Sequence, residues 1–391
     1  MKRLWLKAGH DRRARSGHPW VFSNEIDRLE GNPEPGDAVE VVAARGDFLG
    51  IAYFNPRPLI TARILTREQE SIDEVDFYRK RLQAALDYRE KLYGDMPSLR
   101  LVHGEGDQLP GLVVDRYGDV LAVQLLTLGM EKRRELVLQA LKDLLSPVAI
   151  IGRNDVAVRE LEGLDRKVEL ISGQLPEKLI IREHGLRFRI DLMEGQKTGH
   201  FFDQKENHQA LRGRVEGRDV LDLFCYSGGW SVHAARFGAR SVLGIDISTR
   251  AIELSRENAR LNYKDDICRF EQADVFELLR EMGQTQQRFG TIILDPPAFV
   301  KSKKKLPEAI RGYLTINRRA LQLVEPGGYL FTCSCSYHLK RDVFLDTLRK
   351  AAVQAGRTVR LLEMRGQAFD HPVLLACPET EYLKCAVLQV L

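Results

Sequence analysis

The chain has 391 residues, of which 44% are hydrophobic and 29% are charged, as in an ordinary globular protein. This length predicts two or three domains, because single hydrophobic cores stop growing near ~250–300 residues. The 59 basic and 55 acidic residues give a net charge of only +4, which excludes a strongly basic or acidic chain. No apolar stretch reaches the ~20 residues that span a bilayer, and the N-terminus lacks the apolar core of a signal peptide. We therefore expect a cytoplasmic protein without membrane contact.

The first zone, residues 1–70, is predicted to be a small β domain. Short apolar runs such as VFSNEI and LITARIL alternate with turns rich in Gly, Pro, Asn and Asp, which is typical of strands and hairpins. Arg12 and Arg13 belong to a basic cluster near its start. Such a cluster favours phosphate binding; the alternative is a solvated surface.

The second zone, residues 71–175, reads as an α+β domain. Apolar residues at helical spacing predict a helix from Asp73 to Tyr93, and a second helix is expected over 130–145. Strand-like runs with Gly-Asp turns fill 99–126 and continue to about residue 173. This zone carries no recognisable chemistry.

From about residue 176 to residue 391, short apolar strands alternate with amphipathic helices. This pattern predicts an α/β domain built on a doubly wound parallel sheet. The expected strands end in these stretches: DVLDLFC, SVLGIDI, ICRFEQAD, TIILDPP and YLFTCSCS, with TVRLLEMRG and YLKCAVLQVL closing the chain. Ligands of such sheets bind at the carboxyl ends of the strands, so the residues at these ends are the candidates for function.

The first three strand ends predict an adenosine-containing cofactor. The first leads into a tight turn with Gly228 and Gly229, where a ligand can approach the backbone closely. It matches neither the GxGxxG fingerprint nor a Walker loop. Asp246 ends the second strand, where it can bind two ribose hydroxyls, and Asp274 ends the third, where it can accept from an adenine amine. Each acidic residue taken alone is more typical of a turn or a helix cap.

Residues 219–297 resemble a class I S-adenosylmethionine-dependent methyltransferase. The resemblance implies that the turn from Asp222 to Gly229 wraps the methionine part of S-adenosyl-L-methionine. The residues expected to contact the cofactor at these strand ends are Asp222, Phe224, Ser227, Gly228, Gly229, Asp246, Ile247, Asp274 and Val275. The alternative is a dinucleotide-binding oxidoreductase, whose glycine fingerprint is missing.

The fourth strand ends in DPPAF, residues 295–299. A base with an exocyclic amine can donate to Asp295 and to the carbonyl of Pro296 while Phe299 stacks on its face. Pro297 is expected beside it, and Asp295 also borders the cofactor. The plainer alternative is a proline-rich loop entry. The same motif serves methylation of base amines, where positioning suffices, and methylation of cytosine at C5, where a thiolate must first add to C6.

A cysteine at the end of the fifth strand fits the second chemistry. Cys333 and Cys335 are two apart, so they share a face and only their depth distinguishes them. Cys333 lies within the apolar run and is predicted to be core, whereas Cys335 precedes Ser336, Tyr337 and His338. We therefore predict Cys335 as the nucleophile. The chain has six cysteines but no CxxC pair, so we predict no disulfide framework and no metal; a CxC metal pair with His338 is the alternative.

The segment EGQKTGHFFDQKENH, residues 194–208, precedes the first strand of this domain. Its glycines, aromatics and amides predict a loop or short helix that closes over cofactor and base. We expect Phe202 and Gln204 to contact the cofactor and Lys197 and Thr198 to contact RNA. The alternative is that the phenylalanines are ordinary core residues.

Over nearly its full length the chain resembles the RlmI-type family of bacterial 23S rRNA cytosine-C5 methyltransferases. HPWVFSNEI, GQKTGHFFDQ, DLFCYSGGWS, DPPAFVKSKKK and TCSCS carry this resemblance. It implies an N-terminal PUA domain, a small middle domain and a seven-stranded methyltransferase domain whose last strand is antiparallel. It also implies that Cys335 is the nucleophile, and that 23S rRNA or a precursor of the large ribosomal subunit is the substrate.

The basic loop after DPPAF, with Lys301, Lys303 and Lys304, is expected to brace the RNA around the flipped base. The resemblance also suggests a homodimer. No cysteine accompanies DPPAF, so a release step using a second cysteine is doubtful and the base for the C5 proton is not identified. Two alternatives stay open: methylation of a base amine or ring nitrogen (guanine N7 or N2), and an assembly factor with a vestigial fold.

Overall fold

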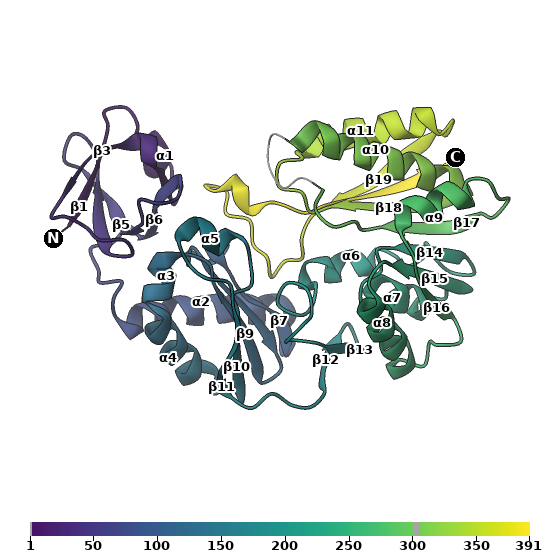
Figure 1. The fold of residues 1–391 in the computed structure, drawn as a ribbon, viewed down its shortest axis with the longest axis horizontal. Coiled ribbons are helices and arrows are strands. Elements are labelled where there is room, and N and C mark those ends of the chain that lie inside the picture. Colours follow the sequence, from purple (N-terminus) through teal and green to yellow (C-terminus); the bar gives the residue numbers. More distant parts are fainter. Residues whose placement is uncertain (1, 300–304) are drawn as a thin grey trace. The chain divides into compact units, whose positions relative to one another are not determined.

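The computed structural model describes residues 2–299 and 305–391. The chain forms two compact units. The first comprises the chain up to Ile181 together with Ile190–Phe202 and Phe369–Thr380; the second comprises Arg182–Arg189, Asp203–Ala368 and Glu381–Leu391. The C-terminal part therefore contributes a short segment to the first unit (Figure 1). The domain boundaries expected at residues 70 and 175 stay a prediction.

The N-terminal part of the first unit is a six-stranded sheet with the order β2-β6-β5-β4-β1-β3. Its strands are β1 (Arg3–Leu6), β2 (Trp20–Phe22), β3 (Ile26–Glu30), β4 (Ala38–Val42), β5 (Phe48–Phe54) and β6 (Ile60–Thr66), with the single-turn helix α1 (Arg12–Arg15) between β1 and β2. Alternate residues such as Leu4, Val41 and Phe54 form its core, as the period-2 pattern predicts.

The middle part of the first unit is a five-stranded sheet with the order β11-β10-β9-β8-β7. Its elements are α2 (Val75–Tyr93), β7 (Ser98–His103), β8 (Leu112–Tyr117), β9 (Val120–Leu125), α3 (Leu128–Lys132), α4 (Arg134–Leu145), β10 (Ala149–Arg153), α5 (Val158–Glu162) and β11 (Val168–Gly173). The single helix expected over 130–145 is wrong in one respect, because it breaks at Arg133 into α3 and α4. The buried Arg133 guanidinium donates to the carbonyls of Gly36 and Gly129, and the first of these, a non-local bond, helps to stabilise the break.

The second unit contains a seven-stranded sheet with the order β16-β15-β14-β17-β18-β20-β19. Its strands are β14 (Asp219–Leu223), β15 (Ser241–Asp246), β16 (Cys268–Gln272), β17 (Phe289–Leu294), β18 (Val324–Ser334), β19 (Val359–Arg365) and β20 (Lys384–Val390). Strands β14 to β18 pair in parallel, and β20 pairs antiparallel with both β18 and β19. This confirms the predicted α/β sheet with an antiparallel last strand. A two-stranded sheet, β12 (Leu179–Glu183) with β13 (Leu186–Ile190), precedes it.

Helices cover both faces of the seven-stranded sheet. They are α6 (Lys205–Gln209), α7 (Gly229–Arg236), α8 (Thr249–Leu261), α9 (Val275–Met282), α10 (Leu306–Leu323) and α11 (Arg341–Gln354). Figure 1 shows α9, α10 and α11 on one side of the sheet and α7 and α8 on the other. Among the described residues, no helix combines the length and the apolar character needed to cross a membrane.

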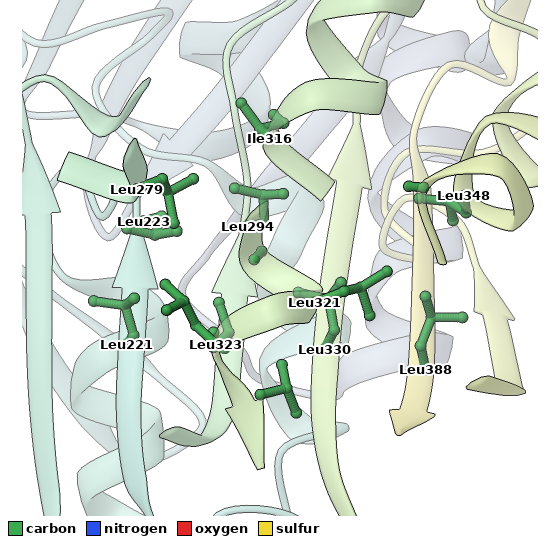
Figure 2. Close-up of a cluster of buried hydrophobic side chains, with 14 of the residues drawn as sticks. Leu221, Leu223, Leu279, Leu294, Ile316, Leu321, Leu323, Leu330, Leu348 and Leu388 are labelled. Atoms are coloured by element: carbon green, nitrogen blue, oxygen red, sulfur yellow. The ribbon is translucent and has the colours of Figure 1, made fainter. Parts of the chain in front are cut away.

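The main core of this unit lies between the sheet and α9, α10 and α11. Leu221 and Leu223 of β14 point into it with Leu294 and Leu330 from the neighbouring strands (Figure 2). Because strand residues alternate between faces, Asp222 is directed to the opposite side, towards α7. The sheet thus buries leucines on one face and sets a carboxylate on the other.

Candidate active site

The turn after β14 forms as predicted and holds three residues in the left-handed region. Phe224 has φ 65°, Tyr226 has φ 47° and Gly228 has φ 80°. A Cβ added at Gly228 would lie 3.1 Å from the Cβ of Ser255, so the turn packs closely on α8. Such conformations are costly for residues other than glycine and tend to occur at functional sites. Ser227 is buried within the turn.

Asp222 is a buried carboxyl group beside this turn. Its Oδ2 accepts a hydrogen bond of 2.6 Å from the Ser231 hydroxyl, whereas its Oδ1 has no hydrogen-bond partner among the described residues. Burial raises the pKa of Asp222 to about 7, and the nearby charges of Asp295 and Asp246 act in the same direction. The site therefore contains an acceptor suited to a cationic or hydrogen-bonding ligand.

Asp246 and Asp274 both lie at strand ends as predicted. The backbone N–H groups of Tyr226 and Ser248 donate to the two oxygens of Asp246, each at 3.0 Å. Asp274 is the N-cap of α9, since its Oδ1 accepts from the next backbone amides. Asp246 is thus oriented by the backbone, and Asp274 caps a helix, which was the alternative interpretation.

The two residues that follow these aspartates differ in exposure. Ile247 is 65% exposed beside Asp246, whereas Val275 is buried in the leucine-rich core. The cofactor contact predicted for each of them stays a prediction.

Asp295, which follows β17, accepts two hydrogen bonds on its Oδ2. Gln204 Nε2 donates at 2.9 Å and Trp230 Nε1 donates at 3.1 Å. The Trp230 ring meets the His208 ring edge-on at 4.8 Å, and His208 Nδ1 lies 2.9 Å from Glu183 Oε1. Asp295 is thereby fixed by side chains from α6 and α7, and one of them, Gln204, was predicted as a site residue.

Cys335 lies directly after β18, one strand away from the DPPAF loop. Its Sγ donates to the carbonyl oxygen of Pro296 at 4.0 Å, so the thiol and this loop meet at the same edge of the sheet. Cys335 is half-buried, whereas the other five cysteines are buried. Burial raises the pKa of Cys333 well above its usual range, as expected for a core residue.

The remaining DPPAF residues surround this point. Pro297 is exposed, and Phe299 is half-buried with its ring 4.7 Å from that of Tyr313. The Tyr313 hydroxyl lies 3.0 Å from the Ser336 hydroxyl. An aromatic wall therefore lines the side of the DPPAF loop that faces α10.

Several predicted residues lie in the first compact unit, which we describe by itself. Phe202 is buried there, with its ring 5.1 Å from that of Tyr117. Thr198 is also buried and bonds to Asp115, so the RNA contact predicted for its side chain has no exposed surface in this conformation. Lys197 is exposed, with its Nζ 4.2 Å from the centre of the Phe201 ring.

Arg12 and Arg13 are exposed on α1. The Arg13 guanidinium lies 4.6 Å from the centre of the Phe22 ring and 3.8 Å from Glu25. The predicted RNA residues Lys301, Lys303 and Lys304 lie outside the described residues. The RNA contacts expected of these five residues stay predictions.

Two clusters of potential metal ligands occur among the described residues: His18, Cys377 and Glu379, and Glu183, His208 and His233. In the second cluster the two imidazole rings stack at 4.6 Å with an interplanar angle of 29°. Nearly parallel rings direct their in-plane lone pairs side by side rather than to one point, so this geometry disfavours a shared metal ion.

The fold and the site together define the class. A family model described as S-adenosylmethionine-dependent methyltransferase matches residues 99–368, and a PUA-like domain model matches residues 4–67. The chain therefore belongs to the S-adenosylmethionine-dependent methyltransferases and uses S-adenosylmethionine as its cofactor.

Similarity to curated proteins identifies a narrower family within this class. Proteins named ribosomal RNA large subunit methyltransferase I from Aeromonas hydrophila and Erwinia tasmaniensis are each 40% identical to this chain. The first match covers 99% of this chain and 98% of the relative, and the second covers 98% of both. The chain belongs to this family of ribosomal RNA large subunit methyltransferases.

Solved structures agree on the fold. A Streptococcus mutans protein proposed to be a SAM-dependent methyltransferase matches with a TM-score of 0.85 at 22% identity, over 100% of both chains. A SAM-dependent methyltransferase from Agrobacterium tumefaciens matches with a TM-score of 0.52 at 18% identity, over 76% of this chain and 90% of that one. At these identities the likeness concerns the fold alone.

The residues at the strand ends fit this cofactor. The Asp222 Oδ1 lacks a partner among the described residues, and a Cβ added at Gly229 would lie 3.1 Å from His208 Cε1, so the helix entry leaves no room for a side chain. Asp246 is held by two backbone amides. The cofactor supplies an electrophilic methyl group, and these residues would hold and orient it.

Sequence reasoning missed three residues of this site. Trp230 directly follows the quoted Gly-Gly turn, and His208 ends the quoted segment 194–208, so both lay within motifs that were already singled out. Lys384 carried no such signal. It becomes a neighbour of Ser334 only through the antiparallel pairing of β18 and β20.

Proposed function

We propose that the protein methylates C5 of a cytosine in 23S rRNA, with Cys335 as the nucleophile. The observation that carries this proposal is the 4.0 Å contact between Cys335 Sγ and the Pro296 carbonyl oxygen. It supports a site in which a base held by the DPPAF loop presents its C6 to the thiol. The names of the relatives, which refer to large-subunit ribosomal RNA, support the substrate.

Cys335 carries the covalent steps of the proposed reaction. The Cys335 thiolate adds to C6, so that a sulfur electron pair forms the S–C6 bond and the C5=C6 pair becomes available at C5. C5 takes the methyl group from the cofactor. A base then removes the C5 proton, the electrons of that bond restore C5=C6, and the S–C6 bond breaks with its pair returning to sulfur.

Asp295 and Pro296 orient the base in this scheme. The Asp295 Oδ2 is already committed to Gln204 and Trp230, which fixes the carboxylate plane. The other carboxylate oxygen and the Pro296 carbonyl would accept from the exocyclic amine of cytosine, while Phe299 would cover the face of the ring.

The alternative function is methylation of a base amine or a guanine ring nitrogen, for which DPPAF alone suffices. The two chemistries differ in the need for Cys335, and this difference is the basis of the test.

The test compares Cys335→Ala with the matched variant Cys333→Ala. The expected result is a loss of methyl transfer to 23S rRNA by ~10³-fold or more in the first. The second should stay active, with a stability cost of about 1 kcal/mol for the small cavity. RNA containing 5-fluorocytosine should trap the parent and Cys333→Ala as covalent adducts, and should not trap Cys335→Ala.

Two outcomes contradict the proposal. Full methylation by Cys335→Ala would support the amine or ring-nitrogen alternative, and mass mapping of the product nucleoside would then identify it. Failure of the parent to bind S-adenosylhomocysteine would contradict both enzyme functions. A cytoplasmic location and a homodimer belong to the same proposal, and sedimentation of the purified protein tests the dimer.

A further inference from the structure

Lys384 is a buried cation beside the end of the strand that carries the two cysteines. It opens β20, where it pairs with Ser334 of β18, and only 5% of its surface is exposed. Its Nζ donates to the main-chain carbonyls of Ser336 and Tyr382 at 2.7 Å each. Both acceptors are neutral, so within the described part of the chain the ammonium group is fully buried without a carboxylate in hydrogen-bond contact.

Of the charged groups around Lys384, Cys335 is the strongest candidate for its counter-ion. Burial lowers the pKa of Lys384 to about 8. The Cys335 thiolate is the strongest influence in the opposite direction, ahead of Glu381, which is exposed, while Lys340 adds to the lowering. A buried ammonium group is stabilised by an anion nearby, and a Cys335 thiolate would supply one here.

Two described groups near Cys335, Tyr313 and Asp295, do not supply a positive charge to it. The hydroxyl of Tyr313 is buried, which raises the pKa of Tyr313 to about 12 and keeps it neutral. Asp295, on the neighbouring strand end, is an anion and would oppose a thiolate. Of the two lysines near this turn, Lys384 is buried and Lys340 is exposed.

We infer that the Lys384 ammonium group is the counter-ion of the Cys335 thiolate. This inference rests on the proposed function, because a thiolate is needed only where sulfur adds to C6. The Cys335 proton leaves to solvent and Lys384 holds the resulting negative charge. When the S–C6 bond later breaks, the electron pair returns to sulfur and the same ammonium group stabilises the departing thiolate.

Lys384 is a positioning residue in this scheme, because its Nζ bonds to the main chain and acts through Cys335. The bond to the Ser336 carbonyl also orders the turn that carries Cys335. A purely structural role would rest on these hydrogen bonds alone. The two roles differ in one measurable quantity, the pKa of the Cys335 thiol.

The experiment measures the rate of Cys335 alkylation by iodoacetamide as a function of pH, with peptide mass spectrometry to read each cysteine separately. In the parent we expect a Cys335 pKa below the ~8.5 of an ordinary cysteine. Lys384→Met should raise it by about one unit, which slows alkylation at pH 7 about tenfold. Lys384→Arg keeps the charge and should stay within a few-fold of the parent, and Lys340→Met is the matched exposed control.

An unchanged alkylation profile in Lys384→Met, or a parent pKa at or above that of ordinary cysteine, would overturn the inference. Binding of S-adenosylhomocysteine checks that each variant is folded. If Lys384→Met is unfolded, the parent profile and Lys384→Arg decide the question. Alkylation needs no turnover, so its outcome is separate from that of methyl transfer by Cys335→Ala, which tests the proposed function.

Discussion

Replacing Asp222 by Asn should make the stability of the second unit less dependent on pH. Asp222 is buried in β14 and receives one hydrogen bond, from Ser231. Its pKa is raised to about 7 because burial disfavours the carboxylate. Asn has nearly the same shape and accepts the same bond through its amide oxygen, but it carries no charge at any pH of interest.

The sign and size of this change in stability follow from the pKa of Asp222 in the folded protein and its pKa in the unfolded chain. The folded-state pKa of Asp222 lies above the value of 3.8 for an ordinary aspartate, so the folded protein holds a proton that the unfolded chain loses. Its contribution is fully present below 3.8 and is lost as pH rises through 7. At about 1.4 kcal/mol per unit, the total loss is about 4 kcal/mol, of which about 3 kcal/mol falls between pH 5 and pH 9. Asp222→Asn should gain this amount relative to the parent.

The assay uses the fluorescence of Trp230, because the other two tryptophans, Trp5 and Trp20, precede the second unit. In a Trp5→Phe/Trp20→Phe background, urea unfolding followed at Trp230 reports on the second unit alone. The matched control is Asp219→Asn on the same strand. Asp219 is bonded to Arg240, which lowers its pKa. This contribution is complete above the ordinary carboxyl pKa, so Asp219→Asn should be less stable than the parent by the same amount at pH 5 and at pH 9.

The result that would refute this reasoning is a difference between Asp222→Asn and the parent that is equal at pH 5 and pH 9. It would mean that Asp222 is ionised in the folded protein as readily as in the unfolded chain. A difference of the opposite sign would mean that a cation holds the carboxylate, and adding S-adenosylmethionine would then have no further effect on its titration.

Two further predictions concern the cofactor turn and RNA. Gly228→Ala should lower stability by about 1–3 kcal/mol and weaken S-adenosylhomocysteine binding, measured by calorimetry. The reason is that Gly228 has a φ of +80°, which strains other residues, and that an added Cβ would meet Ser255 at 3.1 Å. The control is Gly213→Ala, at φ +73° in open space, which should cost about 1 kcal/mol and leave binding unchanged. Affinity for 23S rRNA should fall steeply with salt, and the double variant Arg12→Ala/Arg13→Ala should reduce the slope of log K against log[salt] by about 1.5, at ~0.7–0.9 per phosphate contact. No change in affinity between low and moderate salt would contradict electrostatic binding.

The sheet was predictable because its signals are local. Most strands of the second unit are short apolar runs, and most of its helices have their apolar residues at helical spacing, so the order of elements could be inferred without tertiary information. The same locality explains the errors. The helix break at Arg133 depends on hydrogen bonds to Gly36 and Gly129, and no pattern within residues 128–145 encodes the first of them.

The C-terminal segment Phe369–Thr380 shows more clearly that local sequence patterns do not predict long-range contacts. It belongs to the first compact unit, where the Asp370 carbonyl accepts from the Arg89 guanidinium and its carboxylate accepts from the backbone amide of Arg100. These partners are about 270 to 281 positions away in sequence. Hydrophobic periodicity has no means of registering such contacts, and the segment reads as a plain loop.

The residues of the candidate site also differ in how far local signals predict them. Cys335 and Asp295 were predictable, because strand ends of a parallel sheet meet at one edge and each of these residues ends its own strand. Lys384 begins a strand instead of ending one, and the pairing that sets it beside Ser334 is antiparallel, which reverses the rule. An antiparallel strand inserted in a parallel sheet brings its first residues to the edge where the other strands end. The start of β20 is therefore the place where Lys384 meets the turn that carries Cys335, the proposed nucleophile.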